Sequence, residues 1–478
     1  MHITKKQTIK PPSNLEQKQR NNDNPNRKLP NFTGTRRVAT GDIISAGTFG
    51  SSMVAFAPHA TTLFLRFRRF KTQFLGTQVP KLKQSLSLTL KHYIPFAGNI
   101  LYPLIPTEKP SFRYVEGDSV PFTVSESTND FDSLVGYGPR DADQFYDYVP
   151  HLPPVKDETG FKILPGLAIQ VTLFSGSGIC IGIAYSHAFA DGVGIVSFIK
   201  AWASTNKLEG TDEDLLIRAG KNMPLFDRNL VRDPHGIGTV FWNQIRHVPF
   251  HSSTFPLPKK KVRTTYLLHE SDIKKLKESV MSKKPGITYL SSFVTVAAYM
   301  WSTIVKSGDS IGEQVDESRD EYFIFPVDVR ARVDPPVPGN YIGNCTAPGR
   351  LKMRHGVLAG DEGFFAAAEA MSYYIQNTVN NKERVLEGAE NWLSDFKKMK
   401  GGGTFGVSES PKFDLYSVDF GWGEARKVEV PSIDWENHTM SMCKPRDSER
   451  GIEVGLSLPT PRMEAFAALF AHGLQQSR

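Results

Sequence analysis

Cysteine is scarce in this chain. The three cysteines, Cys180, Cys345 and Cys443, are scattered over 478 residues. A disulfide framework or a cysteine-ligated metal site needs several cysteines at short spacing, so this pattern argues against both. Three isolated thiols suit a reducing compartment, and without a clear signal peptide we expect a cytoplasmic protein.

Long apolar runs are also missing. The stretch from Ile43 to Leu65 is moderately apolar, but Pro58, His59 and several Gly and Ser residues interrupt it. A membrane-spanning helix needs about 20 apolar residues, so we expect no membrane association.

Acidic residues are rare at the N-terminus. Residues 1–75 contain 13 Lys and Arg but 3 Asp and Glu, which leaves 44 basic and 47 acidic residues for the rest of the chain. The net charge of +7 therefore belongs to a tail and gives no reason to expect nucleic-acid binding. Residues 1–30 have the polar composition that is typical of disorder. We expect residues 1–77 to form an atypical basic segment that is partly disordered.

The stretch YSHAFADGVG at 185–194 joins two regions of different periodicity. Upstream, residues 167–174 and 179–185 predict two strands that are connected by the turn-forming sequence SGSG. Downstream, apolar residues recur at helical spacing over 193–202. His187 is therefore predicted at the exit from a buried strand, where rigid neighbours hold it and it can face a cavity.

A neutral imidazole can take a proton from a hydroxyl and return it later, so His187 is a candidate catalytic base. Other interpretations stay open. His187 could be a core residue, Asp191 could cap a helix that begins at Gly192, or the pair could be half of a metal site. With no second histidine nearby, a metal is the weakest of these alternatives.

A second motif, DFGWG, occupies 419–423. Its residues are Asp419, Phe420, Gly421, Trp422 and Gly423. The glycines allow backbone conformations that other residues avoid, the tryptophan can anchor a loop, and the aspartate can hydrogen-bond its own turn. None of these groups is a good proton carrier near neutral pH, so we predict an architectural role.

A third segment, DVRARVDPPVPGNYIGNC, spans 328–345. On an extended strand Arg330 and Arg332 would point the same way, and one of them is a candidate partner for a buried Asp191. Two solvated arginines are the alternative. The end of the segment predicts a tight turn, with structural roles for Tyr341, Gly343 and Asn344.

In order and spacing, the three motifs resemble the BAHD acyltransferase family, plant enzymes that use acyl-CoA donors. The third segment is similar to the form DxRxRxxPPxPxxYFGNC of the flavonoid-glycoside branch, although Ile342 replaces the family's Phe. The resemblance covers roughly residues 78–474. It implies an α/β fold with two similar-sized domains of the chloramphenicol-acetyltransferase-like type, joined by a long crossover loop, with an active-site channel at their interface.

From this resemblance and the composition we expect three parts. An N-terminal acyltransferase domain over 78–205 carries HxxxDG, a crossover linker spans 206–261, and a C-terminal acyltransferase domain over 262–478 carries YIGNC and DFGWG. Relatives are expected to begin with a short strand and an aromatic-rich segment that lines the site. Residues 61–70, TTLFLRFRRF, are the nearest counterpart in this chain.

The resemblance also implies the chemistry. His187 would remove the proton of an acceptor hydroxyl and then protonate the departing CoA thiolate, without a covalent intermediate. Asp191 would pair with an arginine and support the structure. Acyl-CoA would be a co-substrate, with no bound cofactor or metal, and a monomer would suffice. The acyl group would be malonyl or hydroxycinnamoyl, and the acceptor a flavonoid, anthocyanin or other phenolic glycoside.

Two further sets of side chains are candidates for binding. Many relatives have Thr and Trp where this chain has Ser408 and Ser410, and a hydroxyl at either position could stabilise the oxyanion. Ser291 and Ser292 begin a predicted helix whose free N–H groups suit a phosphate of coenzyme A, with an ordinary helix cap as the alternative. Rival functions are an impaired binding protein, a BAHD enzyme for another alcohol or amine, and a peptide-synthetase condensation domain.

Overall fold

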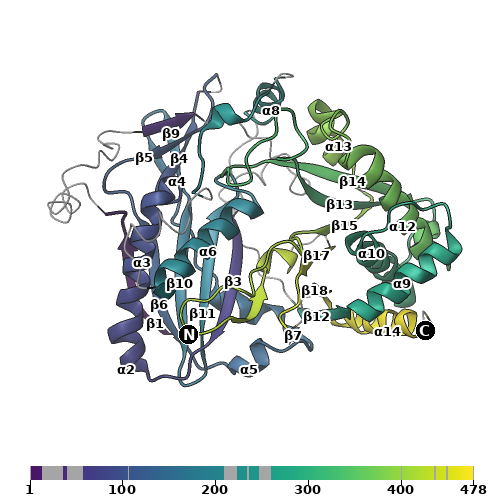
Figure 1. The fold of residues 1–478 in the computed structure, drawn as a ribbon, viewed down its shortest axis with the longest axis horizontal. Coiled ribbons are helices and arrows are strands. Elements are labelled where there is room, and N and C mark those ends of the chain that lie inside the picture. The colour runs from purple at the N-terminus through teal and green to yellow at the C-terminus, as the bar shows by residue number, and fades with distance from the viewer. Residues whose placement is uncertain are drawn as a thin grey trace.

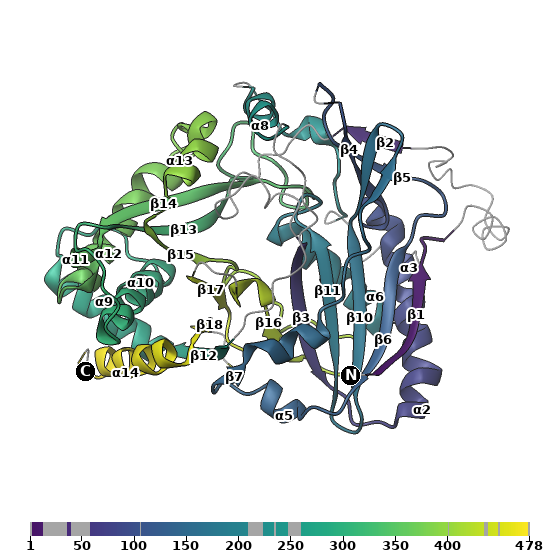
Figure 2. The same cartoon turned by 180° about the vertical axis from the view of Figure 1, so that it is seen from behind.

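The computed structural model describes residues 2–12, 36–39, 58–105, 107–208, 223–233, 236–246, 260–399, 401–434, 438–447 and 450–476. Two lobes lie side by side (Figure 1), and the view from behind shows the same separation (Figure 2). The first lobe contains a six-stranded sheet and a smaller five-stranded sheet, and the second contains a seven-stranded sheet.

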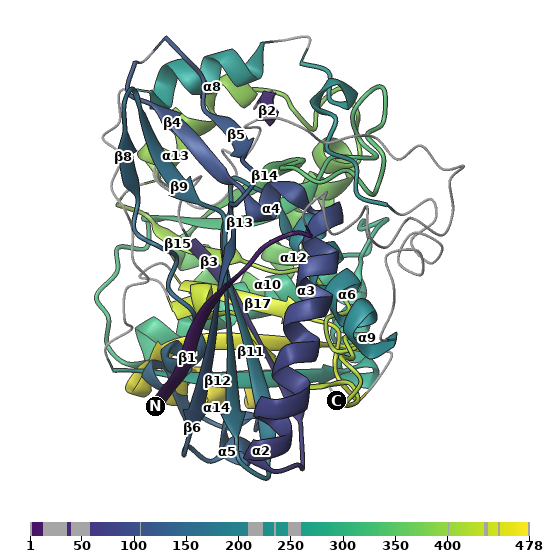
Figure 3. The same ribbon diagram turned by 90° about the vertical axis from the view of Figure 1, so that its left-hand side faces the viewer.

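The six-stranded sheet of the first lobe is mixed. In spatial order its strands are β1 (His2–Ile9), β6 (Val120–Ser127), β10 (Leu167–Phe174), β11 (Gly178–Ser186), β3 (Pro58–Arg66) and β16 (Ala425–Glu429). Strands β10 and β11 form the expected hairpin and are buried along their whole length, as their apolar sequences predict. Helices α3 (Val79–His92) and α6 (Gly192–Leu208) pack over one face (Figure 3).

The five-stranded sheet lies beyond one end of the larger sheet (Figure 1). Its order is β2 (Arg36–Ala39), β5 (Ser111–Tyr114), β4 (Asn99–Pro103), β9 (Phe161–Pro165) and β8 (Lys156–Glu158).

The second lobe has the order β14 (Thr346–Arg354), β13 (Asp320–Asp328), β15 (Gly403–Val407), β17 (His438–Cys443), β18 (Gly451–Pro459), β12 (Lys261–His269) and β7 (Arg140–Asp141). Its longer helices are α9 (Glu270–Lys283), α10 (Ser292–Ser310), α12 (Gly363–Tyr374) and α14 (Thr460–Gln476). Helix α10 is buried on nearly all sides, which explains why its sequence is apolar well beyond a single stripe.

Short helices connect these elements. They are α2 (Lys71–Gln73), η3 (Phe74–Gln78), α4 (Ile94–Ala97), α5 (Phe131–Leu134), η4 (Ala142–Tyr148), η6 (Arg228–Leu230), α8 (Ile237–Ile245), α11 (His355–Ala359), η7 (Ile375–Val379), η8 (Ala389–Asn391), α13 (Trp392–Lys398) and η9 (Pro431–Asp434).

The N-terminal segment differs from its prediction in two places. Residues 2–9 form strand β1, which pairs with β6, although their composition is typical of disorder. An edge strand needs few apolar side chains because its backbone hydrogen bonds hold it, and in β1 Ile9 is buried. Strand β3 lies inside the sheet, between β11 and β16, so the expected domain boundary at residue 78 cuts off a central strand. The rest of residues 1–30, from 13 on, lies outside the described residues.

The two lobes exchange strands, which the expected boundaries also miss. Strand β16 comes from the second half of the chain and pairs with β3 of the first lobe. Strand β7 comes from the first half and pairs with β12 of the second lobe. Both strands are short, so neither has enough residues to show a strand periodicity in the sequence.

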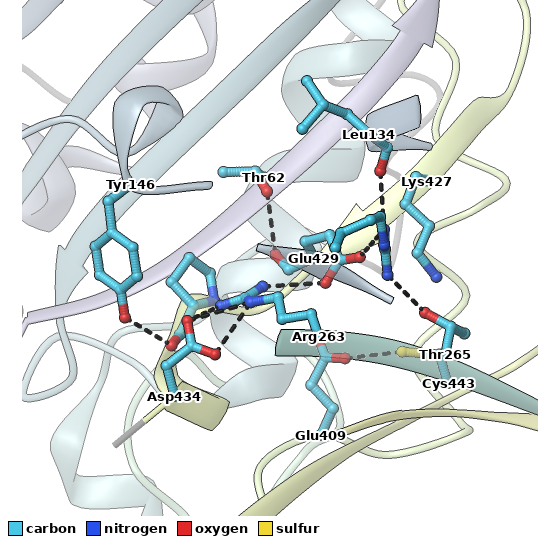
Figure 4. Close-up of polar contacts among 12 residues, drawn as sticks. Thr62, Leu134, Tyr146, Arg263, Thr265, Glu409, Lys427, Glu429, Asp434 and Cys443 are labelled. Atoms are coloured by element: carbon cyan, nitrogen blue, oxygen red, sulfur yellow. Dashed lines mark hydrogen bonds and ion pairs between the residues drawn. The ribbon is translucent and has the colours of Figure 1, made fainter. Parts of the chain in front are cut away.

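A buried ionic network fills the place where the strands are exchanged (Figure 4). Arg140 and Arg263 lie opposite each other in the β7–β12 ladder. Glu429 of β16 lies between these like charges, with Oε1 2.8 Å from Arg140 Nη1 and Oε2 3.0 Å from Arg263 Nη1. Asp434 forms a second ion pair with Arg263. The network joins both sheets and replaces the water that these charges would otherwise need.

The expected crossover, 206–261, contributes to both cores. Helix α6 continues to Leu208, and within helix α8 Phe241 packs into the core of the second lobe while Trp242 packs into that of the first. A nine-residue helix in a polar region gives a weak periodic signal, which explains why it was not predicted. Over the described ranges, no helix is both long and apolar enough to cross a membrane.

Candidate active site

His187 lies in the turn between β11 and α6, directly after the last residue of the strand. The N–H of Phe189 donates to the carbonyl of Ser186 and closes this turn. Helix α6 begins at Gly192, where a Cβ atom would come within 2.5 Å of the Phe413 ring. The histidine side chain is almost fully enclosed, with 8% of its surface exposed.

Asp191 holds the turn to the second lobe. Its Oδ2 lies 2.8 Å from Nη2 of Arg330, and both side chains are buried. Oδ2 also accepts the N–H of Cys345, and Oδ1 accepts the N–H of Gly194 at 3.2 Å. Asp191 is therefore an N-cap and an ion-pair partner at the same time, two roles that the sequence left as separate possibilities.

The structure brings Arg330, and not Arg332, to Asp191. The expectation that both arginines point the same way from an extended segment is wrong, because strand β13 ends at Asp328 and a turn follows. In this turn the N–H of Arg330 donates to Asp328 Oδ1, and Arg332 turns away toward the carbonyl of Asp328.

The YIGNC residues wrap around the histidine turn. Nδ2 of Asn344 donates to the carbonyl of His187 at 2.9 Å, which fixes the backbone of the histidine. Arg330 donates to the carbonyls of Tyr341 and Gly343, both at 3.1 Å. The expected tight turn is a bend at Gly343. The second lobe thus holds His187 through its backbone as well as through Asp191.

Burial governs the electrostatics of His187. It disfavours the charged ring and lowers the pKa of His187, while the charge of Asp191 and the nearby acceptor groups of the His187 backbone and the Asn344 side chain act in the opposite direction with less effect. The imidazole is therefore neutral at neutral pH, the form in which it can accept a proton.

The DFGWG motif lies at the other end of α6. Asp419 Oδ1 accepts the N–H groups of Gly421, Trp422 and Gly423, at 2.7, 3.0 and 2.9 Å, and both glycines have positive φ. Asp419 Oδ2 pairs with Lys207 in the last turn of the helix. Because α6 has 17 residues, about 25 Å of helix separates this motif from Asp191.

Aromatic packing and one hydrogen bond anchor the same motif in the first lobe. The Phe420 ring packs edge-on against Trp202 with centroids 4.9 Å apart, and the indole N–H of Trp422 donates to Gln78 Oε1. These contacts hold DFGWG to the first lobe at the end of α6 that is far from His187, as an architectural role would require.

The four serine candidates have local partners. The Ser408 hydroxyl donates to the carbonyl of Met440 at 3.3 Å, and Ser410 Oγ accepts the N–H of Lys412 at 3.3 Å. Ser291 is the N-cap of α10 and accepts the N–H of Val294, and Ser292 Oγ accepts from Lys277 Nζ.

Two titratable residues near the site were missed. The ring of His59 in β3 lies 4.5 Å from the ring of His187, centroid to centroid. Glu409, between Ser408 and Ser410, accepts a hydrogen bond from the Cys443 thiol at 2.8 Å, and burial raises its pKa to about 7 despite that bond. The register of β3 against β11 was needed to find His59, and no local pattern signals it.

In the part of the chain that the structure describes, no group of three His, Cys, Asp or Glu side chains could hold a metal ion.

Comparisons with known proteins identify the family of this chain. The profile of the Transferase family matches residues 54–472. The chain is 48% identical over 423 residues to a malonyl-coenzyme:anthocyanin 5-O-glucoside-6'''-O-malonyltransferase of Salvia splendens, covering 88% of this chain and 89% of that protein. It is 41% identical over 429 residues to phenolic glucoside malonyltransferase 1 of Nicotiana tabacum, covering 89% and 94%.

Among solved structures, vinorine synthase superposes with a TM-score of 0.67 at 17% identity, over 97% of this chain and 96% of that one. This likeness shows the two-domain acyltransferase fold. Taken with the sequence matches, it places the chain in the Transferase family, the BAHD acyltransferases, within the branch of the anthocyanin and phenolic-glucoside enzymes.

Proposed function

We propose that this protein transfers a malonyl group from malonyl-CoA to a sugar hydroxyl of an anthocyanin or other phenolic glucoside. The observation that supports this most directly is a buried, neutral His187 that both lobes hold. The choice of malonyl rests on the relatives, because three malonyltransferases are 48%, 41% and 38% identical, whereas two coumaroyltransferases are 33% and 32% identical.

In the proposed mechanism, acyl-CoA and the acceptor meet at His187 in a channel between the lobes. Nε2 of His187 takes the proton of the sugar hydroxyl while the oxygen attacks the thioester carbonyl. The tetrahedral intermediate then collapses, and the same nitrogen protonates the CoA thiolate. Holding both substrates in place supplies a large part of the rate, and no covalent acyl-enzyme forms.

Asp191 acts here as a positioning residue. Its carboxylate oxygens are engaged by Arg330 and by the N–H groups of Gly194 and Cys345, so it orients the turn that carries the base and does not relay a proton. Ser408 and Ser410 are the candidates for stabilising the oxyanion. The hydroxyl proton of Ser408 is directed to Met440, so Ser410 is the better donor of the two.

The N-terminus of α10 is the proposed contact for a phosphate of coenzyme A. Ser291 and Ser292 present a hydroxyl and free backbone N–H groups there, and Lys277 adds a positive charge through its bond to Ser292. We further infer a cytoplasmic location, because the three cysteines are buried and form no disulfide among the described residues. The proposed mechanism requires neither a permanent cofactor nor a second subunit.

The test is release of coenzyme A. Purified protein is incubated with malonyl-CoA or p-coumaroyl-CoA and with anthocyanidin 3-O-glucosides, anthocyanidin 5-O-glucosides or a simple phenolic glucoside. We expect turnover with malonyl-CoA and a glucoside, and its loss in His187→Ala, while His151→Ala, a change at an exposed histidine, leaves it intact. Product formation by His187→Ala at the unaltered rate would rule out the proposed base. Binding of both substrates without any product would favour an impaired binding protein instead.

A further inference from the structure

Three rings gather on one face of the first sheet beside the catalytic turn. His59 lies directly opposite Tyr185 in the antiparallel ladder of β3 and β11, so their side chains project from the same face. His187 follows Tyr185 by two residues and comes to that face as well. The His59 ring centroid is 4.5 Å from that of His187 and 6.0 Å from that of Tyr185.

Each of the two histidines has one unsatisfied ring nitrogen. Nε2 of His59 and Nδ1 of His187 are both buried, and within the described ranges neither has a hydrogen-bond partner. A buried polar atom without a partner is costly, so such atoms are usually paired in the working state of a protein. At a centroid separation of 4.5 Å, the two nitrogens can come within hydrogen-bond distance if the rings turn them toward each other about χ2.

The other neighbours are occupied in different ways. Asp191, the nearest carboxylate, uses its oxygens for Arg330 and for the backbone at the start of α6. Asn344 has a buried Oδ1 without a partner among the described residues, and its Nδ2 is fixed to the carbonyl of His187. The candidate acceptors for the Nδ1–H of His187 are therefore His59 Nε2, Asn344 Oδ1 and the carbonyl of His187 itself, and the last of these already accepts from Asn344 Nδ2.

We propose that His59 is a positioning residue for the acyl transfer, in which its Nε2 accepts the Nδ1–H of His187. This inference rests on the proposed function of His187. The contact holds His187 in the tautomer whose Nε2 has a free lone pair, and it stabilises the imidazolium that forms when the acceptor hydroxyl loses its proton. His59 takes part as a neutral ring that carries its own proton on Nδ1.

The charge state of His59 fits this role. Burial and then the proximity of His187 lower the pKa of His59 well below its ordinary value, so the ring is neutral and can accept. The titratable and charged groups around the pair are Tyr185 on β11, Asp191 before α6, Arg330 after β13, and Glu409 after β15, whose charge reaches Tyr185. Of these groups, Asp191 stabilises the protonated form of His187 through its negative charge. A neutral His59 that accepts a hydrogen bond from His187 would stabilise the same form.

The experiment compares His59→Phe, which keeps a ring but has no acceptor, with His59→Gln, whose amide oxygen can take the place of Nε2. We expect His59→Phe to lower kcat about ten-fold, to leave the KM for malonyl-CoA within about two-fold, and to move the acid limb of the rate profile about one pH unit lower. His59→Gln should restore most of kcat. His151→Phe, at an exposed histidine, is the matched control and should change none of these values.

A second measurement is independent of turnover. The imidazole of His187 is followed by NMR of histidine-labelled protein, with its signals assigned from His187→Ala. The pKa of His187 should fall in His59→Phe, and the fraction of its Nδ1–H tautomer should fall with it. Melting curves establish that each variant is folded, and if His59→Phe fails to fold, His59→Gln and His59→Asn carry the comparison.

Three results would overturn the inference. The first is an acid limb that moves to higher pH in His59→Phe, which would mean that His59 repels the charged ring. The second is a loss of kcat without any change in the pKa or tautomer of His187. The third is a change in both properties in Asn344→Ala but not in His59→Phe. Wild-type protein that binds its substrates without turnover would count against the proposed function, whereas the NMR result would still decide the part of His59.

Discussion

Replacing Asp191 by Asn separates a structural aspartate from a proton relay. The change removes one charge of an ion pair in which both side chains are almost completely buried, at 1% and 3% exposure. The new side chain is isosteric and its oxygen can still accept the N–H of Gly194, so the cap of α6 survives. What remains is a buried guanidinium on Arg330 without its main counter-ion.

The cost follows from the partners that Arg330 keeps. They are Asp328 Oδ1 at 3.0 Å, on a half-exposed side chain, and the carbonyls of Tyr341 and Gly343. Breaking a buried ion pair by removing one partner typically costs about 3–5 kcal/mol, and the retained acceptors put Asp191→Asn near the lower end, at about 3 kcal/mol. For a lobe of about 200 residues this corresponds to a fall in Tm of about 6–12 °C.

Melting temperature and kcat, measured on the same preparations, distinguish the two roles. If Asp191 only positions the turn, Asp191→Asn loses stability as calculated and keeps measurable turnover below its Tm. If it relays charge to His187, kcat falls by a factor on the order of 10⁴, as in triads where the orienting carboxylate is neutralised. Asp328→Asn is the control, because this half-exposed carboxylate should contribute less than about 1 kcal/mol. A Tm within about 2 °C of wild type combined with a thousand-fold loss of kcat would refute the structural assignment.

Three other predictions concern His187, Glu429 and Asp419. Since burial lowers the pKa of His187 and the base must be neutral, the acid limb of kcat/KM should have its midpoint below pH ~6.5, and a midpoint above 7 would contradict this. Glu429→Gln should lower the free energy of unfolding in urea by about 2–4 kcal/mol, because Arg140 and Arg263 then face each other without the anion between them. An unchanged urea midpoint would mean that the ionic network is dispensable. Asp419→Ala should cost about 1–3 kcal/mol at pH 7, since three N–H groups lose their acceptor. Although burial opposes it, Lys207 and the backbone N–H groups lower the pKa of Asp419, so its contribution is present above pH ~4, and the gap between wild type and Asp419→Ala should close as pH falls below that value.

Periodicity and motif chemistry predicted the parts of the fold that depend on neighbours in sequence. The buried hairpin of β10 and β11 was predicted close to its true bounds, and the starts of α6 and α10 were predicted correctly, because a continuous apolar run or a helical stripe survives in the sequence alone. The motifs also located His187 and Asp191 at the strand-to-helix turn.

The features of the fold that depend on pairing between distant segments were not predicted. Strands β7 and β16 change lobes in two and five residues, too few to carry a pattern. The end of strand β13 determines which arginine reaches Asp191. The carboxylate of Asp328 accepts the N–H of Arg330 in the turn that follows, and this turn directs the Arg330 side chain toward Asp191. His59 reaches the site through its register with Tyr185, and register across a sheet cannot be read from one strand.

Helix α6 connects these observations, because the second half of the chain holds it at both ends. Asp191 at its start is tied to Arg330 and Cys345, and Lys207 in its last turn is tied to Asp419 of the DFGWG motif. The turn that carries His187 is continuous with the first of these ends. We therefore expect a change at either end to shift the turn that carries the proposed base, so a motif about 25 Å from Asp191 would affect catalysis without any contact with substrate. On this view, loss of the DFGWG contacts acts on kcat through the placement of the turn, and it leaves the pKa of His187, which burial sets, where it was.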